Sequence, residues 1–134
     1  MKVTVKHVDN LKFTCLAEGK PEICIENASD TPCGPTPKEL ILMGLAGCTG
    51  MDVASILKKM RQEFKQFYIA VETTVTDEHP KVFNDIKILY KISNTVSKEK
   101  MERAVELSQT QYCGVSTMIK AHSNISYEIE YLSE

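Results

Sequence analysis

The sequence predicts an α+β fold with the element order β-β-β-α-β-β-α-α-β. Segments at both ends of the chain alternate apolar and polar residues, as strands with one buried face do. Between them lies a segment from Pro37 to about Phe64 in which apolar residues recur at helical spacing. Because the chain has 134 residues and no long linker, we expect a single domain over residues 1–134.

The first third of the chain predicts three strands. Residues 2–8 alternate, and residues 11–27 are typical of a hairpin with its turn at residues 19–20. That register places Cys15 directly opposite Cys24, close enough for side-chain contact. We expect these two thiols to be reduced neighbours.

The long helix carries a clear start signal. Thr36 is a good N-cap, Pro37 suits the first helical position, and Glu39 completes a capping box. Residues 40–48 have no polar face, and a helix that is apolar all round is buried all round. In a chain this small, a second subunit is one way to bury it, so we expect a homodimer with a large apolar interface.

The second half of the chain predicts two further strands, two helices and a closing strand. The strands lie at residues 67–76 and 84–92. Ser97 caps the next helix, and a break at Gly114 precedes a short final helix. The inner face of the first of these helices consists of Met101, Ala104, Val105 and Ser108. The residues that alternate in the closing strand are Ile125, Tyr127, Ile129 and Tyr131.

Charge and hydropathy exclude several classes of partner. The net charge is −2 and no Lys/Arg-rich run occurs, so we expect neither nucleic acid nor an anionic membrane as a partner. The longest apolar stretch, residues 40–48, is too short to span a bilayer. The chain begins with a strand-like alternation, which is not a signal peptide, and we expect a cytoplasmic protein.

The five cysteines form no CxxC pair. An odd count without such pairs argues against a secreted disulfide framework and against a common zinc site, so we expect no metal and no cofactor. A functional cysteine pair is then expected to be redox-active rather than structural. The alternative is that all five are small buried hydrophobes.

Cys48 is the main candidate for a working thiol. It lies in the long helix among Gly44, Gly47 and Gly50, although each glycine in a helix costs about 1 kcal/mol relative to alanine. Small neighbours serve either close helix packing or access of a substrate to the sulfur. Cys113 is the second candidate, because it precedes a helix break, and thiols on two helices suit capture of a sulfenic acid by a second thiol.

The thiolate and not the thiol is the nucleophile, so a reactive Cys48 needs a nearby cation that lowers the pKa of the thiol. The helix start is about three turns away, too far for its dipole to act. Asp52, one turn on, opposes ionisation. The cation must therefore come from elsewhere in the fold or from a partner subunit, and Lys20 and Lys38 are candidates, with surface charge as the alternative for both.

The segment "GPTPKELILMGLAGCTGMDVASILKKMRQ", followed later by "QYCGVS", resembles the OsmC/Ohr family of osmotically inducible and organic hydroperoxide resistance proteins. The resemblance covers nearly the whole chain. It implies an intertwined homodimer with the two long helices at its centre and active sites at the interface. It also implies reduction of organic hydroperoxides at the expense of a dithiol reductant, with Cys48 as peroxidatic and Cys113 as resolving cysteine.

The chain departs from the family pattern around the thiolate. Peroxidases of the family carry an arginine in the N-terminal hairpin region and a glutamate directly after the proline that opens the helix. Here Lys20 stands in the hairpin, Lys38 follows the proline, and Glu39 comes one residue late. These three residues are our candidates for thiolate stabilisation, and the chain resembles the branch that lacks the Arg/Glu pair. We expect a Cys48 pKa below the free value of about 8.5.

Apolar residues near the thiol, namely Met43, Leu45, Ala46 and Met51, predict a preference for organic hydroperoxides over hydrogen peroxide. Two other functions remain open from the sequence. One is a binding module that holds an apolar or sulfur-containing ligand in an interface cleft. The other is a redox sensor or a structural stress protein without efficient turnover.

Overall fold

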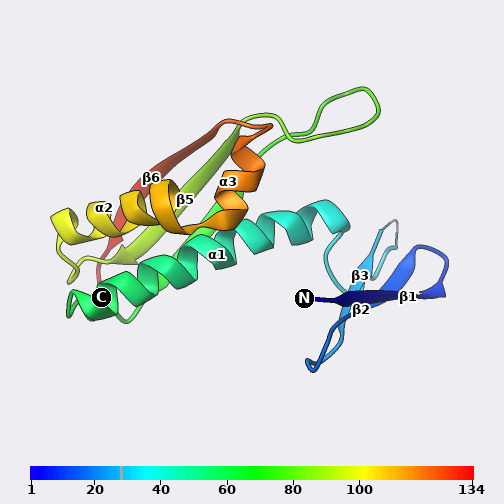
Figure 1. Ribbon diagram of the computed structural model, residues 1–134, viewed down its shortest axis with the longest axis horizontal. Helices are drawn as coiled ribbons and strands as arrows, with labels where there is room; N and C mark the ends of the chain where they lie inside the picture. The colour runs from blue at the N-terminus through cyan, green and yellow to red at the C-terminus, as the bar shows by residue number, and fades with distance from the viewer. Residues whose placement is uncertain (28) are drawn as a thin grey trace. The chain divides into compact units, whose positions relative to one another are not determined.

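The elements follow one another in the predicted order, with one π-helical turn added between the last two helices (Figure 1). The structure, a computed structural model, describes residues 1–27 and 29–134. The chain divides into two compact units, Met1–Leu42 and Met43–Glu134. The predicted α+β class is confirmed, and each unit contains its own three-stranded sheet.

The first unit is built on an antiparallel meander of β1 (Val3–Asp9), β2 (Lys12–Ala17) and β3 (Ile23–Glu26). Several apolar side chains remain exposed on these strands. The exposed apolar side chains are Val3, Val5, Val8, Leu16 and Ile23.

The register of the β2–β3 hairpin differs from the prediction by one residue. Cys15 pairs with Ile23, and Cys24 pairs with Thr14, so Cys15 and Cys24 are not opposite each other. The loop is centred on Gly19, whose φ of 79° favours glycine, rather than on a two-residue turn. Pro21 has no N–H to donate to the ladder, so the strand resumes only after it. A slip of one residue places two side chains on opposite faces of the sheet.

Cys24 forms a disulfide with Cys33, with a Cα–Cα distance of 5.8 Å. This corrects the expectation that Cys24 is a reduced neighbour of Cys15. The backbone N–H of Cys33 also donates to Glu26 Oε1 at 3.0 Å. A Cβ at Gly34 would collide with the carbonyl of Cys24, so only glycine permits this close approach. The disulfide therefore ties β3 to the segment that leads into the long helix.

Helix α1 spans Pro37–Lys59. The predicted capping box is confirmed: the Thr36 N–H donates to Glu39 Oε1 at 2.9 Å, and the Glu39 N–H donates to Thr36 Oγ1 at 3.3 Å. The helix ends before Phe64, earlier than predicted, because Arg61 adopts a left-handed conformation with φ of 59°. Phe64 continues the apolar pattern by packing edge-on against Phe67, with ring centroids 5.6 Å apart.

The second unit has the strand order β4-β5-β6, in which β5 is antiparallel to β4 and parallel to β6. A parallel pair needs a crossover connection, and the helical segments between β5 and β6 supply it. The elements are β4 (Phe67–Glu72), β5 (Ile86–Ser93), α2 (Lys98–Leu107), the π-helix η1 (Ser108–Tyr112), α3 (Gly114–Lys120) and β6 (Ile125–Leu132).

The core lies between one face of β5 and the helices that cover it (Figure 1). Residues at alternate positions of β5 are buried, including Tyr90, while Lys87 on the other face is exposed. The predicted inner face of α2 is confirmed, and Ser97 caps that helix by accepting a hydrogen bond from the Lys100 N–H. The fully buried apolar residues of this cluster include Leu45, Val53, Leu57, Ile86, Ile88, Ile92, Met101, Ala104 and Val105.

Helix α1 is buried along one stripe only, which consists of Leu45, Thr49, Val53 and Leu57. Other apolar side chains on it are exposed within one chain, and Met51 has 76% of its surface accessible. The whole helix is long and apolar enough to cross a membrane, although residues 40–48 alone are not. Core helices of soluble proteins share that property, and the buried stripe of α1 is part of the core of the second unit.

Replacing both Cys24 and Cys33 by serine is expected to lower the free energy of unfolding of the first unit by about 2 to 3 kcal/mol. The disulfide joins residues nine apart in sequence and so restricts the unfolded chain. Hydrogen exchange of the β3 amides, measured at increasing denaturant concentration, gives the change in the free energy of unfolding. Cys15→Ser is the matched control, because Cys15 is free. Equal stability of both variants and wild type would contradict the prediction.

Candidate active site

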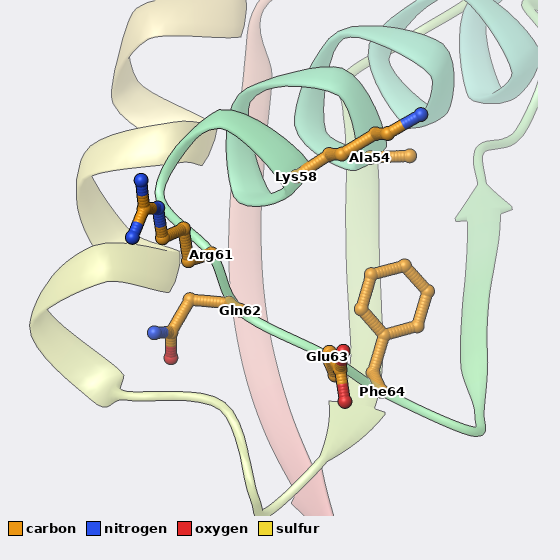
Figure 2. Close-up of a pocket in the computed structure, with 6 residues that line it drawn as sticks. All are labelled: Ala54, Lys58, Arg61, Gln62, Glu63 and Phe64. Atoms are coloured by element: carbon orange, nitrogen blue, oxygen red, sulfur yellow. The ribbon is translucent and has the colours of Figure 1, made fainter.

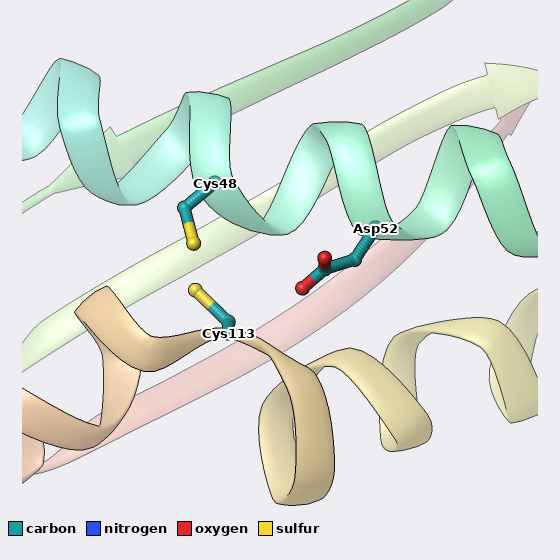
Figure 3. Close-up of side chains that lie close together, drawn as sticks. All are labelled: Cys48, Asp52 and Cys113. Atoms are coloured by element: carbon teal, nitrogen blue, oxygen red, sulfur yellow. The ribbon is translucent and has the colours of Figure 1, made fainter.

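The structure brings Cys48 and Cys113 side by side, with their sulfurs directed toward each other (Figure 3). Cys48 comes from the middle of α1, and Cys113 from the junction of η1 and α3. Asp52, one turn after Cys48, completes a group in which the two sulfurs and a carboxylate oxygen all lie within 4.8 Å of one another. Cys48 is half-buried, whereas only 1% of Cys113 is exposed. Both thiols are free, and both belong to the second unit.

The backbone around Cys113 explains where its sulfur points. After α2 the helix widens into the π-helix η1, and the Cys113 N–H donates to the Ser108 carbonyl at 2.8 Å. Cys113 then takes an extended conformation and acts as the N-cap of α3, with its Sγ accepting from the Ser116 N–H at 3.3 Å. The predicted break at Gly114 thus begins at Cys113. Single π-turns inside helices are often found at functional sites.

A chain of buried hydroxyls lies beside the thiols. Thr49 Oγ1 lies 2.7 Å from both Tyr90 OH and Ser108 Oγ, and Ser108 Oγ donates to Asp52 Oδ2 at 2.9 Å. An ionised carboxylate only accepts hydrogen bonds, so the last donor fixes the direction of the chain. Thr49 therefore donates to Ser108, and Tyr90 donates to Thr49.

Gln109 closes this network from η1. Its Nε2 donates to Thr49 Oγ1 and Tyr90 OH, both at 3.2 Å. The backbone carbonyl of Gln109 accepts from Lys120 Nζ at 2.7 Å. Burial raises the pKa of Tyr90 to about 12, which keeps its hydroxyl protonated as the donor that the chain requires.

The sequence pattern places Ser108 on the inner face of its helix but gives Thr49 and Tyr90 no polar role, so it does not predict most of this network. A signal was present, because Thr49 lies in the helical stripe between Leu45 and Val53, where an apolar residue is expected. A buried hydroxyl needs hydrogen-bond partners, and other polar residues had to supply them.

Within one chain, the environment of Cys48 opposes ionisation. Burial raises the pKa of the Cys48 thiol, and the hydrogen bond and charge of Cys113 and the charge of Asp52 add to the rise. A backbone hydrogen bond from Val115 acts in the opposite direction. This differs from the expected depression of the pKa, because the groups that act on the thiol here include no cation among the described residues.

The proposed stabilising residues Lys20, Lys38 and Glu39 belong to the first unit, whereas the thiols belong to the second. Lys20 lies in the loop between β2 and β3, and Lys38 and Glu39 lie in the first turn of α1. Glu39 already accepts hydrogen bonds from Thr36, and these lower the pKa of the Glu39 carboxyl. The role of all three toward the thiolate stays a prediction.

The glycines around Cys48 have different roles. A Cβ at Gly50 would lie 2.7 Å from Ile69 Cδ1, so Gly50 allows α1 to pack closely on β4. At Gly44 and Gly47 a Cβ would meet no atom of the described residues within 4 Å. Close packing therefore explains Gly50, and Gly44, one turn before Cys48, faces open space among the described residues, while access of a substrate to the sulfur stays a prediction.

A surface hollow of about 540 Å³ lies at the C-terminal end of α1 (Figure 2). It contains neither of the candidate thiols, and one of its side chains has a structural role, because Gln62 Oε1 accepts from the Ser97 N–H at 2.9 Å. The lining residues are Ala54, Lys58, Arg61, Gln62, Glu63 and Phe64. This group offers no pair of nucleophile and base, so the thiol pair remains the candidate site.

The family model described as "OsmC-like protein" matches residues 28–128. The chain belongs to the OsmC-like family. It is 30% identical over 134 residues to Protein YhfA of Escherichia coli strain K12, and the match covers 99% of this chain and 99% of that protein. The resemblance inferred from the two cysteine segments is therefore confirmed at the level of the family.

Solved structures show the same fold over the whole chain. A hypothetical protein from Aquifex aeolicus has a TM-score of 0.87 and 31% identity, with 99% of this chain and 96% of that chain covered. The organic hydroperoxide resistance protein OhrB of Bacillus subtilis has a TM-score of 0.69 and 17% identity, with 96% of each chain covered. At that identity OhrB supports the fold alone.

Replacing Asp52 by asparagine is expected to shift the pH profile of Cys48 alkylation to lower pH. The change removes a negative charge that raises the pKa of the thiol, so the thiolate forms at lower pH. Iodoacetamide labelling of the Cys48 peptide, quantified by mass spectrometry between pH 6 and 10, measures the midpoint. Asp77→Asn changes the net charge equally in a loop outside the site and is expected to leave it unchanged. An unchanged midpoint in Asp52→Asn would show that the carboxylate has no influence on the thiol.

Proposed function

We propose that the protein reduces organic hydroperoxides, with Cys48 as the attacking thiol and Cys113 as the resolving thiol. The observation that carries this proposal is the pair of free thiols from two helices within 4.8 Å of each other. The two differ in access, because Cys48 is half-buried and Cys113 is almost completely buried. A peroxide with an organic tail reaches the more open sulfur first.

The reaction has two steps before the reductant acts. The Cys48 thiolate attacks the distal oxygen of the hydroperoxide, the O–O bond breaks, and the alkoxide takes a proton and leaves as the alcohol. Cys48 is then a sulfenic acid. The Cys113 thiol attacks that sulfur, water leaves, and a Cys48–Cys113 disulfide forms. A dithiol reductant returns both thiols by exchange and is itself oxidised to a disulfide.

The surroundings of Cys48 in one chain raise the pKa of the thiol, so its activation needs a cation from outside those surroundings. We propose that Lys20 or Lys38 supplies the cation and that Glu39 orients it. A lysine is a mobile point charge, whereas arginine offers a planar fork of donors. The thiolate is then held less firmly than in relatives that carry the arginine.

We propose that the protein works as an intertwined homodimer. Within one chain, α1 exposes Ile41, Met43 and Met51, and the first sheet carries an apolar hollow of about 350 Å³. A second copy of the chain is the occupant that this proposal assigns to these surfaces, because exposed apolar side chains gather on both. The residues that line the hollow are Val3, Val5, Cys15, Leu16, Ala17, Lys20, Pro21, Ile23 and Leu40.

The proposed substrate class follows from the apolar surroundings of the thiol. Met43 and Met51 lie on the surface of α1 that the proposed dimer covers, so an organic tail contacts them within a cleft at that interface, at about 0.8 kcal/mol per buried CH₂. Leu45 is fully buried in the core, which corrects its place among the residues expected to flank the substrate. We propose cytoplasmic action with no metal required for turnover and with no nucleic acid or membrane partner.

The second candidate is a redox-sensing or ligand-binding protein without efficient turnover. One observation favours it, namely the raised pKa of Cys48, because a protonated thiol is a poor nucleophile. Oxidation then occurs slowly, and the thiol pair records oxidant exposure instead of removing peroxide. Rapid multiple turnovers with a dithiol reductant distinguish the two functions, since a thiol pair that is oxidised only slowly does not sustain them.

The purified protein with dithiothreitol is expected to consume cumene and tert-butyl hydroperoxides at least tenfold more efficiently than hydrogen peroxide. Two or three buried methylenes, at about 0.8 kcal/mol each, account for that preference in kcat/KM. Cys48→Ser should abolish consumption, and Cys15→Ser is the matched control. Equal efficiencies would mean that the apolar residues are structural, and a lack of turnover with every peroxide would favour the second candidate.

Light scattering is expected to find a dimer at micromolar concentration. Met51→Glu should weaken the dimer at least tenfold, because it places a charge among exposed apolar residues of α1. Met118→Glu is the matched control, since Met118 is similarly exposed on α3. A stable folded monomer of the wild type at this concentration would exclude the proposed assembly.

A further inference from the structure

Cys48, Asp52 and Cys113 also present the donor set of a metal site. Their two sulfurs and one carboxylate oxygen lie within 4.8 Å of one another (Figure 3). In a tetrahedral zinc site with Zn–S bonds of about 2.3 Å, two sulfurs lie about 3.8 Å apart. The distance between any two of the donor atoms thus needs to shorten by no more than about 1 Å for the three side chains to share one ion.

The sequence does not predict this site, because the chain has no CxxC pair. The fold assembles the ligands from distant segments instead. Cys48 and Asp52 are four residues apart on α1 and so face the same side of the helix. Cys113 approaches from the end of η1. Thiolates with a carboxylate suit a cation of the zinc type, which accepts both sulfur and oxygen ligands.

Outer contacts already orient two of the three ligands. Ser108 Oγ donates to Asp52 Oδ2 at 2.9 Å, and the Ser116 N–H donates to Cys113 Sγ at 3.3 Å. Ser108 is in turn held by Thr49 at 2.7 Å. Hydrogen bonds of this kind fix the ligands of metal sites and strengthen metal binding.

The group also has an open side and no counter-charge. A Cβ at Gly44, one turn before Cys48, would meet no atom of residues 1–27 and 29–134 within 4 Å. Zinc sites with three protein ligands take a water as the fourth ligand. Neither ion pair in the described part of the chain, Lys87–Glu128 or Arg103–Glu106, involves Asp52.

We infer that the reduced protein binds one divalent cation of the zinc type through Cys48, Asp52 and Cys113, and that oxidation of the two thiols releases it. Binding displaces one proton from each thiol. When a two-electron oxidant joins the sulfurs as a disulfide, both thiolates are lost and the ion leaves. Metal occupancy and peroxide reduction therefore exclude each other. Only release by peroxide rests on the proposed function, and metal binding does not.

Calorimetric titration of the fully reduced protein with Zn²⁺ tests the site. We expect one ion per chain, and at least tenfold weaker binding in Cys48→Ser and in Asp52→Asn. Wild type oxidised with diamide has the same sequence and is expected to lose the site, which separates loss of ligands from misfolding. Cd²⁺ in place of Zn²⁺ should give the ultraviolet charge-transfer band of thiolate ligands in the reduced protein only.

Two controls address the other cysteines. Reduction also frees Cys24 and Cys33, so the Cys24→Ser/Cys33→Ser variant must retain the full stoichiometry, as must Cys15→Ser. The proposal would be overturned if Zn²⁺ binding persisted after diamide treatment or in Cys48→Ser. Loss of binding in the Cys24→Ser/Cys33→Ser variant would overturn it as well. No peroxide enters the titration, so the two proposals are tested independently. A protein that binds no metal could still reduce peroxides, and a protein that is inactive toward peroxides could still bind the metal.

Discussion

The buried hydroxyl of Thr49 is the constraint on which the geometry of the site depends. It joins α1 to β5 through Tyr90 and to η1 through Ser108, both at 2.7 Å. An unsatisfied buried hydroxyl costs about 1–3 kcal/mol, so any rotation of α1 that breaks these bonds is disfavoured. Cys48 precedes Thr49 directly, and its position opposite Cys113 follows from that fixed rotation.

The same network couples the two halves of the site. Ser108 accepts from Thr49, donates through its hydroxyl to Asp52, and accepts from the Cys113 N–H through its carbonyl. One residue therefore positions the carboxylate and the second sulfur together. The π-helix makes this possible, because its wider turn allows Ser108 to face α1 while Cys113 turns away from the helix path. A regular α-helix over the same residues would rotate these groups apart.

The elements of the fold were predictable because each depends on local sequence. The cap at Ser97, the capping box at Thr36 and the alternation in β5 use only neighbouring residues. Two expectations differ from the structure in detail. The expected β2–β3 register is off by one residue because the loop centres on Gly19. The expected end of α1 is too late because Phe64 continues the apolar pattern after the helix has ended.

The candidate site was predictable only in part. The family resemblance and the helix break pointed to Cys48 and Cys113. The disulfide of Cys24 with Cys33 was not expected, because its partners are joined by a loop whose path depends on the close approach at Gly34. The hydroxyl network was missed for a similar reason, since Thr49 and Tyr90 are 41 residues apart and meet only in the folded core.

The proposed function requires that Cys48 and Cys113 form one redox couple. Its most direct test is peptide mapping of the fully reduced protein after one equivalent of cumene hydroperoxide. We expect a Cys48–Cys113 disulfide in the wild type, and a trapped Cys48 sulfenic acid in Cys113→Ser. An unmodified Cys48, with Cys24–Cys33 as the only bridge formed, would contradict it.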